Sequence, residues 1–275
     1  MTRDELIQVL DLGGVARLRE IFVEQHWQRK RDAAANPLLK AGAKYFSQND
    51  EDGILLEILR RIGRDKGVFV ELGVGNGLEN NTLILLLGGW RGVWVDAQPL
   101  AFNVPRGGPL AFQQAWVSRE NCASLVAHGL QSIGGAGANV LSVDIDGNDL
   151  HVTRALLEAG HSPDVVIVEY NGKFPPPMRW SVQYDPDLRW DGNDYQGASL
   201  QSFVDLLGAH QYRLVACNIT GVNAFFVRNA LADRFADVPA AVDALFMRPD
   251  YNWFVGCGHA TSPLTVGRYL EQQAR

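Results

Sequence analysis

Cysteine is scarce in this chain of 275 residues. Only Cys122, Cys217 and Cys257 occur, and none lies in a CxxC pair or at a Cys/His ligand spacing. A disulfide framework or a zinc site is therefore not expected. A chain of this length does not need such cross-links, because it buries roughly three quarters of its unfolded surface on folding.

The chain also lacks a basic excess, a signal-peptide core and a long apolar run. Lys and Arg number 25 against 31 Asp and Glu, for a net charge of −6, and no basic stripe is visible. Nucleic-acid binding is disfavoured, because it requires basic side chains that neutralise phosphates. A transmembrane helix is also disfavoured, because it needs about 18 apolar residues in a row. With 47% hydrophobic residues, disorder is excluded as well. We expect a globular, cytoplasmic protein that contacts no nucleic acid and does not span a membrane.

Short apolar runs alternate with helical patterns from residue 67 onward. The runs lie at 67–72, 92–96, 112–117, 139–144 and 164–169, and the helical patterns lie around 80–88, 119–131 and 149–159. This alternation predicts a parallel sheet covered on both faces. Two later strands, 212–217 and 222–228, are too close in sequence for a parallel crossover and must pair antiparallel. The predicted fold is α/β, a Rossmann-like doubly wound sheet of five parallel strands plus a C-terminal antiparallel hairpin, with N-terminal helices.

Three segments flank or interrupt this predicted sheet. Residues 1–63 are predicted to be a helical segment packed on the core, with a break at Gly13 and Gly14, and 229–275 a helical or irregular tail. Both segments have apolar faces, so the chain could also associate with itself as a homo-oligomer. Residues 171–197 form an insertion rich in proline and aromatics, within the domain 64–228. Such long loops are usually functional, so we predict a lid, with a packing loop or interface as the alternative.

A glycine-rich turn follows the first predicted strand. After Glu71, glycines stand at 73, 75 and 77, so the third arrives one position too early for the GxGxxG dinucleotide fingerprint. A pyrophosphate would be repelled by Glu71, whereas a cationic amino-acid group would be attracted. The turn therefore favours S-adenosylmethionine over NAD as cofactor, with Glu71, Gly73, Gly75 and Gly77 as binding residues; a tight turn without a ligand is the alternative.

Asp96 ends the second predicted strand, 19 residues after Gly77. In doubly wound folds an acidic residue at this position binds the ribose hydroxyls of a nucleoside. The alternative is that Asp96 only forms a turn at the end of the strand. Because Asp96 occurs together with the glycine-rich turn, cofactor binding is favoured.

Acidic side chains crowd the ends of the fourth and fifth predicted strands. Asp144, Asp146 and Asp149 follow the fourth, and Glu169 and Asn171 follow the fifth. Oxygen-rich clusters suit Mg²⁺ or another hard divalent cation, and we predict Asp144, Glu169 and Asn171 as its ligands. In the competing interpretation the carboxylates contact the cofactor ammonium or the substrate directly. Asp146 and Asp149 are predicted to bind the substrate in this way. Helix capping by these two aspartates also remains open.

Three further side chains are candidates for chemistry or substrate binding. His151 begins a predicted helix and, together with Asp144, is a candidate for taking the hydroxyl proton. Trp180 and Trp190 in the insertion can form a stacking wall for a sugar or other ring, although scattered aromatics are often packing residues.

Residues 67–228 resemble the class I S-adenosylmethionine-dependent methyltransferases, and among them the FkbM-type enzymes. The resemblance is carried by 47–52 (SQNDED), 141–149 (LSVDIDGND), 168–171 (VEYN) and 221–228 (GVNAFFVR), with Asp146 and Asp149 where the FkbM pattern usually has glutamates. It implies that Gln48 closes over the cofactor and that Ser118 contacts the adenine, helix capping being the alternative for Ser118. The acidic cluster is similar to that of metal-dependent O-methyltransferases such as catechol O-methyltransferase.

The resemblance implies methyl transfer from S-adenosylmethionine to a hydroxyl of a small-molecule or saccharide acceptor, such as a sugar, polysaccharide or natural product. Two other functions stay open at this point. One is a nucleotide-cofactor oxidoreductase of Rossmann type, and the other is a non-catalytic protein that uses the cofactor fold for binding.

Overall fold

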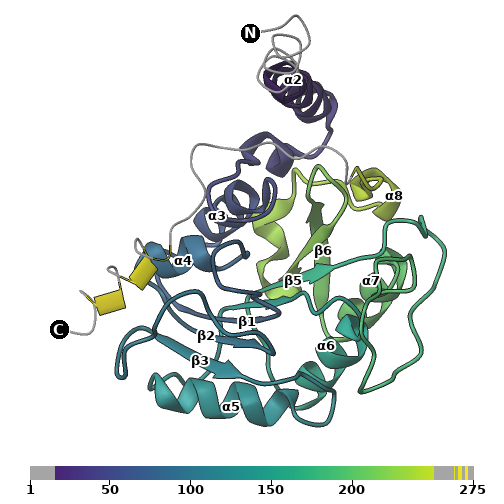
Figure 1. The fold of residues 1–275 in the computed structure, drawn as a ribbon. Helices are drawn as coiled ribbons and strands as arrows, with labels where there is room; N and C mark the ends of the chain where they lie inside the picture. Colours follow the sequence, from purple (N-terminus) through teal and green to yellow (C-terminus); the bar gives the residue numbers. More distant parts are fainter. Residues whose placement is uncertain (1–15, 251–262, 264–265, 268–269, 272–275) are drawn as a thin grey trace, which may run out of the picture.

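The computed structural model describes residues 16–250, 263, 266, 267, 270 and 271. The predicted helix before Gly13 and the third cysteine, Cys257, lie outside the described residues. Along the chain the elements are α2 (Ala16–Ala33), η2 (Pro37–Ala41), α3 (Glu51–Arg61), β1 (Val68–Leu72), α4 (Leu83–Leu87), β2 (Arg91–Asp96), β3 (Leu110–Gln114), α5 (Cys122–Ser132), β4 (Val140–Val143), α6 (Asp149–Glu158), β5 (Val165–Glu169), α7 (Leu200–Ala209), β6 (Tyr212–Cys217), β7 (Asn223–Arg228), η3 (Asn229–Phe235) and α8 (Val242–Leu245) (Figure 1). None of the helices in the described part of the chain is both long and apolar enough to cross a membrane.

The strands form a seven-stranded sheet in the order β3-β2-β1-β4-β5-β7-β6. Neighbours from β3 to β5 pair parallel, and β7 pairs antiparallel with both β5 and β6. The α/β prediction and its closing hairpin are therefore confirmed. Because the chain moves outward from β1 to β3 and then returns to β4, the order reverses beside β1. In open α/β sheets ligands bind outside the carboxyl ends of strands at such a point.

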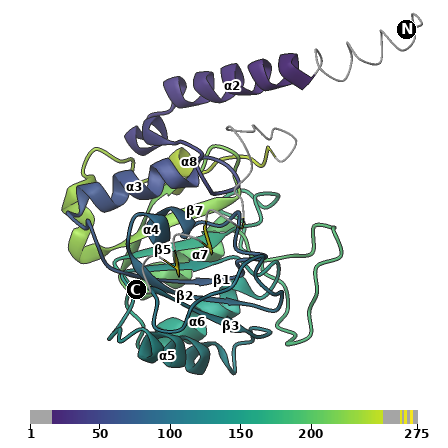
Figure 2. The ribbon, with the colours of Figure 1, turned by 60° about the vertical axis from the view of Figure 1, so that its left-hand side comes forward.

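Helices cover both faces of the sheet. Figure 2 shows α5 and α6 on one side and α3 and α4 on the other, with α2 extending away from the body. Successive strand residues alternate between the two faces, so Val70 and Leu72 pack in the core under α5 and α6. Phe69 and Trp94 pack in the opposite core with α3 and α4. Two buried apolar layers thus fix the strand ends that carry the candidate site.

Several predicted boundaries are wrong by a few residues. The third strand was expected at 112–117 but runs from Leu110 to Gln114, because it pairs with β2 from Gly92 to Asp96 and ends where β2 ends. The helix expected at 80–88 is confined to α4, Leu83–Leu87. Within the predicted helical segment 1–63, α2 ends at Ala33, and Asn36 then caps the short η2 by accepting a hydrogen bond from the Leu38 amide.

The acidic run Asp50–Asp52, at the N-cap and first turn of α3, is buried in the protein. Asp52 accepts hydrogen bonds from the amides of residues 45–47 at 2.6–2.8 Å. Glu51 accepts from Asn218 Nδ2 at 2.6 Å, and Asp50 accepts from the Ile219 amide at 3.1 Å. Burial, followed by the neighbouring Glu51 charge, raises the pKa of Asp50 to about 7. These contacts join the N-terminal segment to the turn between β6 and β7.

Candidate active site

A cleft of about 1260 Å³ opens at the carboxyl ends of β1, β2, β4 and β5 and at the start of β7. Most of the predicted site residues line it: Gln48, Glu71, Gly73, Gly75, Asp96, Asp144, Asp146, Glu169, Asn171 and Trp190. The other predicted residues are not part of its lining: Gly77, Ser118, Asp149, His151 and Trp180. The fold thus gathers predicted residues as far apart in sequence as Gln48 and Trp190 around one cavity.

The glycine turn has two different steric requirements. A Cβ on Gly73 would lie 1.6 Å from the Asp144 carbonyl oxygen, so only glycine allows β1 and β4 to approach this closely. A Cβ on Gly75 would meet nothing within 4 Å, although its φ of +55° lies in the left-handed region. Gly73 therefore permits packing, whereas Gly75 keeps space open at the cleft.

Asp96 connects the glycine turn to the end of β2. Its Oδ2 accepts a hydrogen bond from the Gly75 amide at 2.7 Å, and its Oδ1 accepts from the Gln98 amide at 2.7 Å. The side chain is half-buried and lines the cleft. The two sequence features that predicted a nucleoside site are thus in direct contact.

Glu71 is buried beneath the cleft, and its carboxylate is engaged by the protein. It accepts hydrogen bonds from Asn80 Nδ2, from the Asn81 and Thr82 amides, and from Thr82 Oγ1, at 2.5–2.9 Å. Burial raises the pKa of Glu71, and the hydrogen bonds from Thr82 and its neighbours oppose that rise. The carboxylate orders residues 80–82, which explains why α4 begins only at Leu83.

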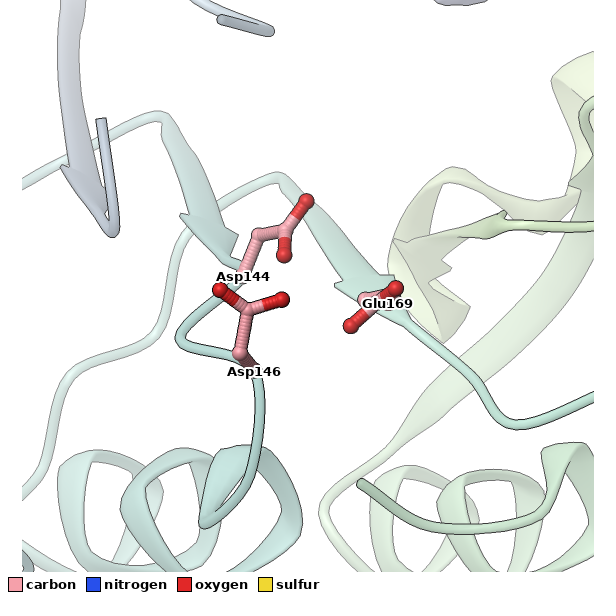
Figure 3. Close-up of side chains that lie close together, drawn as sticks. All are labelled: Asp144, Asp146 and Glu169. Carbon is pink, nitrogen blue, oxygen red and sulfur yellow. The ribbon is translucent and has the colours of Figure 1, made fainter. Parts of the chain in front are cut away.

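Three carboxylates converge at the ends of β4 and β5. One oxygen from each of Asp144, Asp146 and Glu169 lies within 4.8 Å of the other two (Figure 3). Asp146 adopts a φ of +56°, a left-handed conformation that is strained for most residues other than glycine but that Asp tolerates better. Burial raises the pKa values of all three groups, and like-charge repulsion adds to this effect. The group suits a hard cation with oxygen ligands.

The structure places Asn171 and Asp149 differently from this trio. Asn171 is buried at the cleft wall, but its Nδ2 donates to the carbonyls of Asp194 and Gln196 at 2.9 and 3.0 Å. Asp149 accepts from the Ile145 and Gly147 amides at 2.8 Å through its two oxygens. Burial raises the pKa of Asp149 to about 6 against these hydrogen bonds. Asp149 is the first residue of α6 and orders the loop after β4, but it does not cap the helix, whose N-cap residue Asn148 makes no side-chain capping hydrogen bond.

The remaining predicted residues have packing contacts outside the cleft. A Cβ on Gly77 would lie 2.7 Å from Leu100 Cδ2, so this glycine permits close packing. The Ser118 amide donates to Asn121 Oδ1 at 2.8 Å in the turn before α5. His151 Nε2 lies 3.0 Å from the Val182 carbonyl, and Trp180 stacks on Phe174 with centroids 4.3 Å apart. Sequence position alone did not distinguish these neighbours of the cleft from its lining.

The insertion crosses from β5 to the loop after β3. Trp116 Nε1 donates to the Pro186 carbonyl at 2.7 Å, and the Arg189 guanidinium lies 4.7 Å from the Trp116 ring centroid. Between these ends, Asn148 Nδ2 donates to the Asp185 carbonyl at 2.7 Å. Trp190, 49% exposed, lies on the cleft side of this bridge. Sequence reasoning missed Trp116 and Arg189, because nothing in the pattern predicted that the insertion would reach β3.

Buried polar atoms without a partner are concentrated around the cleft and share one chemistry. Five residues of its lining carry such an atom, and every one is an oxygen acceptor: Asn80 Oδ1, Asn148 Oδ1, Glu169 Oε2, Gln196 Oε1 and Asn223 Oδ1. Buried polar groups normally have partners, so this group indicates a ligand that brings donors or positive charge. The four amides were missed as site residues, since Asn and Gln carry no distinctive sequence signal.

Several solved structures with low similarity to this chain are described as methyltransferases. One, described as the MycE methyltransferase from the mycinamycin biosynthetic pathway in complex with Mg, SAH and mycinamycin VI, is 14% identical with a TM-score of 0.41. That match covers 62% of this chain and 47% of the other, so the chain spans about half the length of that protein.

Two other structures cover more of both chains. An O-methyltransferase family protein from Burkholderia thailandensis is 9% identical over 76% of this chain and 71% of that one, with a TM-score of 0.35. Coclaurine N-methyltransferase bound to N-methylheliamine and SAH is 13% identical over 78% and 72%, with a TM-score of 0.32. No family model and no curated protein sequence matches. Because these identities and scores are low, the residues of this chain must carry the functional proposal.

Proposed function

We propose that this protein is an S-adenosylmethionine-dependent methyltransferase that methylates a hydroxyl oxygen of a small molecule or saccharide. The observation that carries the proposal is the set of five unpartnered acceptor oxygens in the cleft lining, together with the carboxylates beside them. A ligand with ammonium and hydroxyl donors and a positively charged sulfonium complements these atoms. The pyrophosphate of a dinucleotide would instead add negative charge to an acidic cavity, which disfavours the oxidoreductase alternative.

The cofactor is proposed to lie across β1 and β2. Asp96 would accept the ribose hydroxyls, since it lies at the strand end and its half-buried carboxylate faces the cleft. Gly75 leaves the space through which the ligand passes beside the backbone. Gln48 would cover the amino-acid end, and Glu71 would act indirectly by ordering residues 80–82.

The chemistry required of the protein is positioning and proton removal. When bound, S-adenosylmethionine supplies an activated methyl group whose bonding electrons remain with sulfur. The cleft must hold the acceptor oxygen in line with that methyl group. As the new O–C bond forms, the hydroxyl proton passes to a carboxylate, for which Asp144 at the end of β4 is proposed. His151 is not proposed as the base, because its ring bonds to the insertion outside the cleft.

The three-carboxylate group also fits a divalent cation. Asp144, Asp146 and Glu169 would hold Mg²⁺ or a similar ion, and such an ion would lower the pKa of an acceptor hydroxyl. Asp146 replaces Asn171 in this proposed ligand set, because the Asn171 side chain is engaged by the insertion.

Calorimetry tests this proposal directly. S-adenosylmethionine and S-adenosylhomocysteine should bind, NAD should not, and Asp96→Ala should weaken binding at least tenfold, about 1.4 kcal/mol. Binding of NAD without S-adenosylmethionine would overturn the proposal. Cofactor binding without turnover over a broad acceptor panel would favour the non-catalytic alternative.

A further inference from the structure

Two of the unpartnered oxygens belong to one cross-strand pair. Glu169 at the end of β5 and Asn223 at the start of β7 are direct partners in the antiparallel register. Side chains of such partners extend from the same face, with Cβ atoms about 5 Å apart. Both residues line the cleft, and Glu169 Oε2 and Asn223 Oδ1 lack partners. The pair therefore presents two hydrogen-bond acceptors side by side.

The orientation of the Asn223 side-chain amide is set by a hydrogen bond to Glu51. Asn223 is only 3% exposed, and its Nδ2 donates to Glu51 Oε1 at 3.3 Å. Its backbone amide donates to Asn218 Oδ1 at 2.9 Å. With the nitrogen held against Glu51, the oxygen is the half of the amide that remains for another molecule. A packing role alone would not leave this oxygen without a donor.

The pair is far from the proposed ribose site. Moving from β2 to β7 crosses β1, β4 and β5, four strand spacings or about 19 Å. Asp96 and Asn223 therefore lie at opposite ends of the cleft, with the acidic trio between them. If the nucleoside lies at Asp96, the pair belongs to the acceptor side.

The surroundings of the acceptor side indicate its chemistry. Asn223 contributes an oxygen without adding a charge, so neutral hydroxyl donors match it. Trp190, half-exposed in the same cleft, offers an apolar face for ring carbons. A molecule that combines an apolar ring face with hydroxyls on neighbouring carbons is a saccharide or cyclic polyol.

We propose that Glu169 and Asn223 bind two neighbouring hydroxyl groups of a saccharide or polyol acceptor and hold one of them for methylation. This inference rests on the proposed methyltransferase function, narrows the acceptor to a molecule with hydroxyls on neighbouring carbons, and adds the residue Asn223.

The test uses ligand-observed NMR titrations of the 275-residue chain with S-adenosylhomocysteine and Mg²⁺ present. The probes are methyl pyranosides with vicinal hydroxyls, their monodeoxy counterparts, and phenethylamine as a cationic probe. Two variants separate recognition from packing. Asn223→Leu removes the oxygen and the bond to Glu51, whereas Asn223→Asp loses that bond but keeps an oxygen toward the cleft. Calorimetric binding of S-adenosylhomocysteine and the melting temperature report whether each variant folds.

We expect the diol probes to bind the native protein at least tenfold more tightly than the deoxy probes. Asn223→Leu should abolish this preference, and Asn223→Asp should keep it. Equal binding of diol and deoxy probes, preference for the amine, no glycoside binding while the cofactor binds, or equal losses in both folded variants would each overturn the inference. Failure of the native protein to bind S-adenosylhomocysteine would instead overturn the proposed function.

Discussion

At the scale of single residues, Gly75 allows the sharpest test of the cleft. Gly75→Val should weaken S-adenosylmethionine binding at least a hundredfold, about 2.7 kcal/mol, because the new side chain would occupy open space where the ligand is proposed to lie. Calorimetry measures the change. Gly107→Val is a matched control, since Gly107 also has positive φ and open space but lies outside the cleft lining. Similar losses in both variants would show that backbone strain, and not the cofactor, explains the effect.

Asp50 permits a residue-scale prediction about pH. Its pKa of about 7 exceeds the ordinary 3.8, so the folded protein retains a proton that the unfolded chain releases. The stabilisation is complete below pH 3.8 and is lost as pH rises through about 7. Asp50→Asn keeps an acceptor for Ile219 and removes the titration. At pH 8 it should raise the free energy of unfolding by up to about 4 kcal/mol, from about three pKa units.

Urea denaturation between pH 4 and 8 measures this difference. The curves of the native protein and Asp50→Asn should converge at low pH and separate as pH rises. Curves that stay parallel over the whole range would contradict burial of the Asp50 carboxyl as the cause.

Residue types were predicted from the sequence more readily than their orientations. Glycine spacing and the strand-end position of Asp96 located the turn and its partner, because both follow from strand order. The sequence does not show that Glu71 and Asp149 direct their carboxylates to backbone amides. Those contacts depend on how the loops after β1 and β4 close, which no spacing rule determines.

At the scale of elements, the two tryptophans of the insertion have different surroundings, although the sequence predicts the same role for both. Trp190→Ala should reduce kcat/KM for the acceptor at least tenfold, about 1.4 kcal/mol, with cofactor affinity unchanged, because Trp190 lines the cleft. Trp180→Ala should lower the melting temperature instead, since Trp180 stacks on Phe174 and meets Tyr195 edge-on. Steady-state kinetics and thermal unfolding of both variants test this division. Equal kinetic losses at equal stability would refute it.

Elements with clear periodicity were predicted well, and those shaped by loop contacts were not. All seven strands were anticipated because their apolar runs are continuous or paired across a short turn. Helix α7 was overlooked next to the insertion, although Ser199 caps it by accepting a hydrogen bond from the Ser202 amide at 3.3 Å. The Ser-x-x-Ser spacing before Phe203 was the available signal.

At the scale of the whole molecule, the concentration of negative charge at the strand ends predicts an effect of metal ions on stability. Mg²⁺ at a hundred times its dissociation constant should stabilise the protein by about 2.7 kcal/mol, because it neutralises Asp144, Asp146 and Glu169 in the folded state. Asp146→Asn should reduce this gain, whereas Asp187→Asn, an exposed aspartate outside the cleft lining, should preserve it. Thermal unfolding with Mg²⁺ or with EDTA measures both. A gain that is identical in both variants would remove the metal from the proposal.

The buried acidic run at residues 50–52 has a consequence for how the protein can be divided. Glu51 is the partner of Asn218 and Asn223, and Ile54, Leu55 and Ile58 are completely buried in the core shared with the sheet. A fragment that starts at residue 64 would lose these partners and expose that apolar surface. We therefore expect residues 1–63 to be inseparable from the sheet, as the predicted helical segment packed on the core would be. Recombination at this position should yield chimaeras that aggregate, so the helical segment and the sheet must be inherited together.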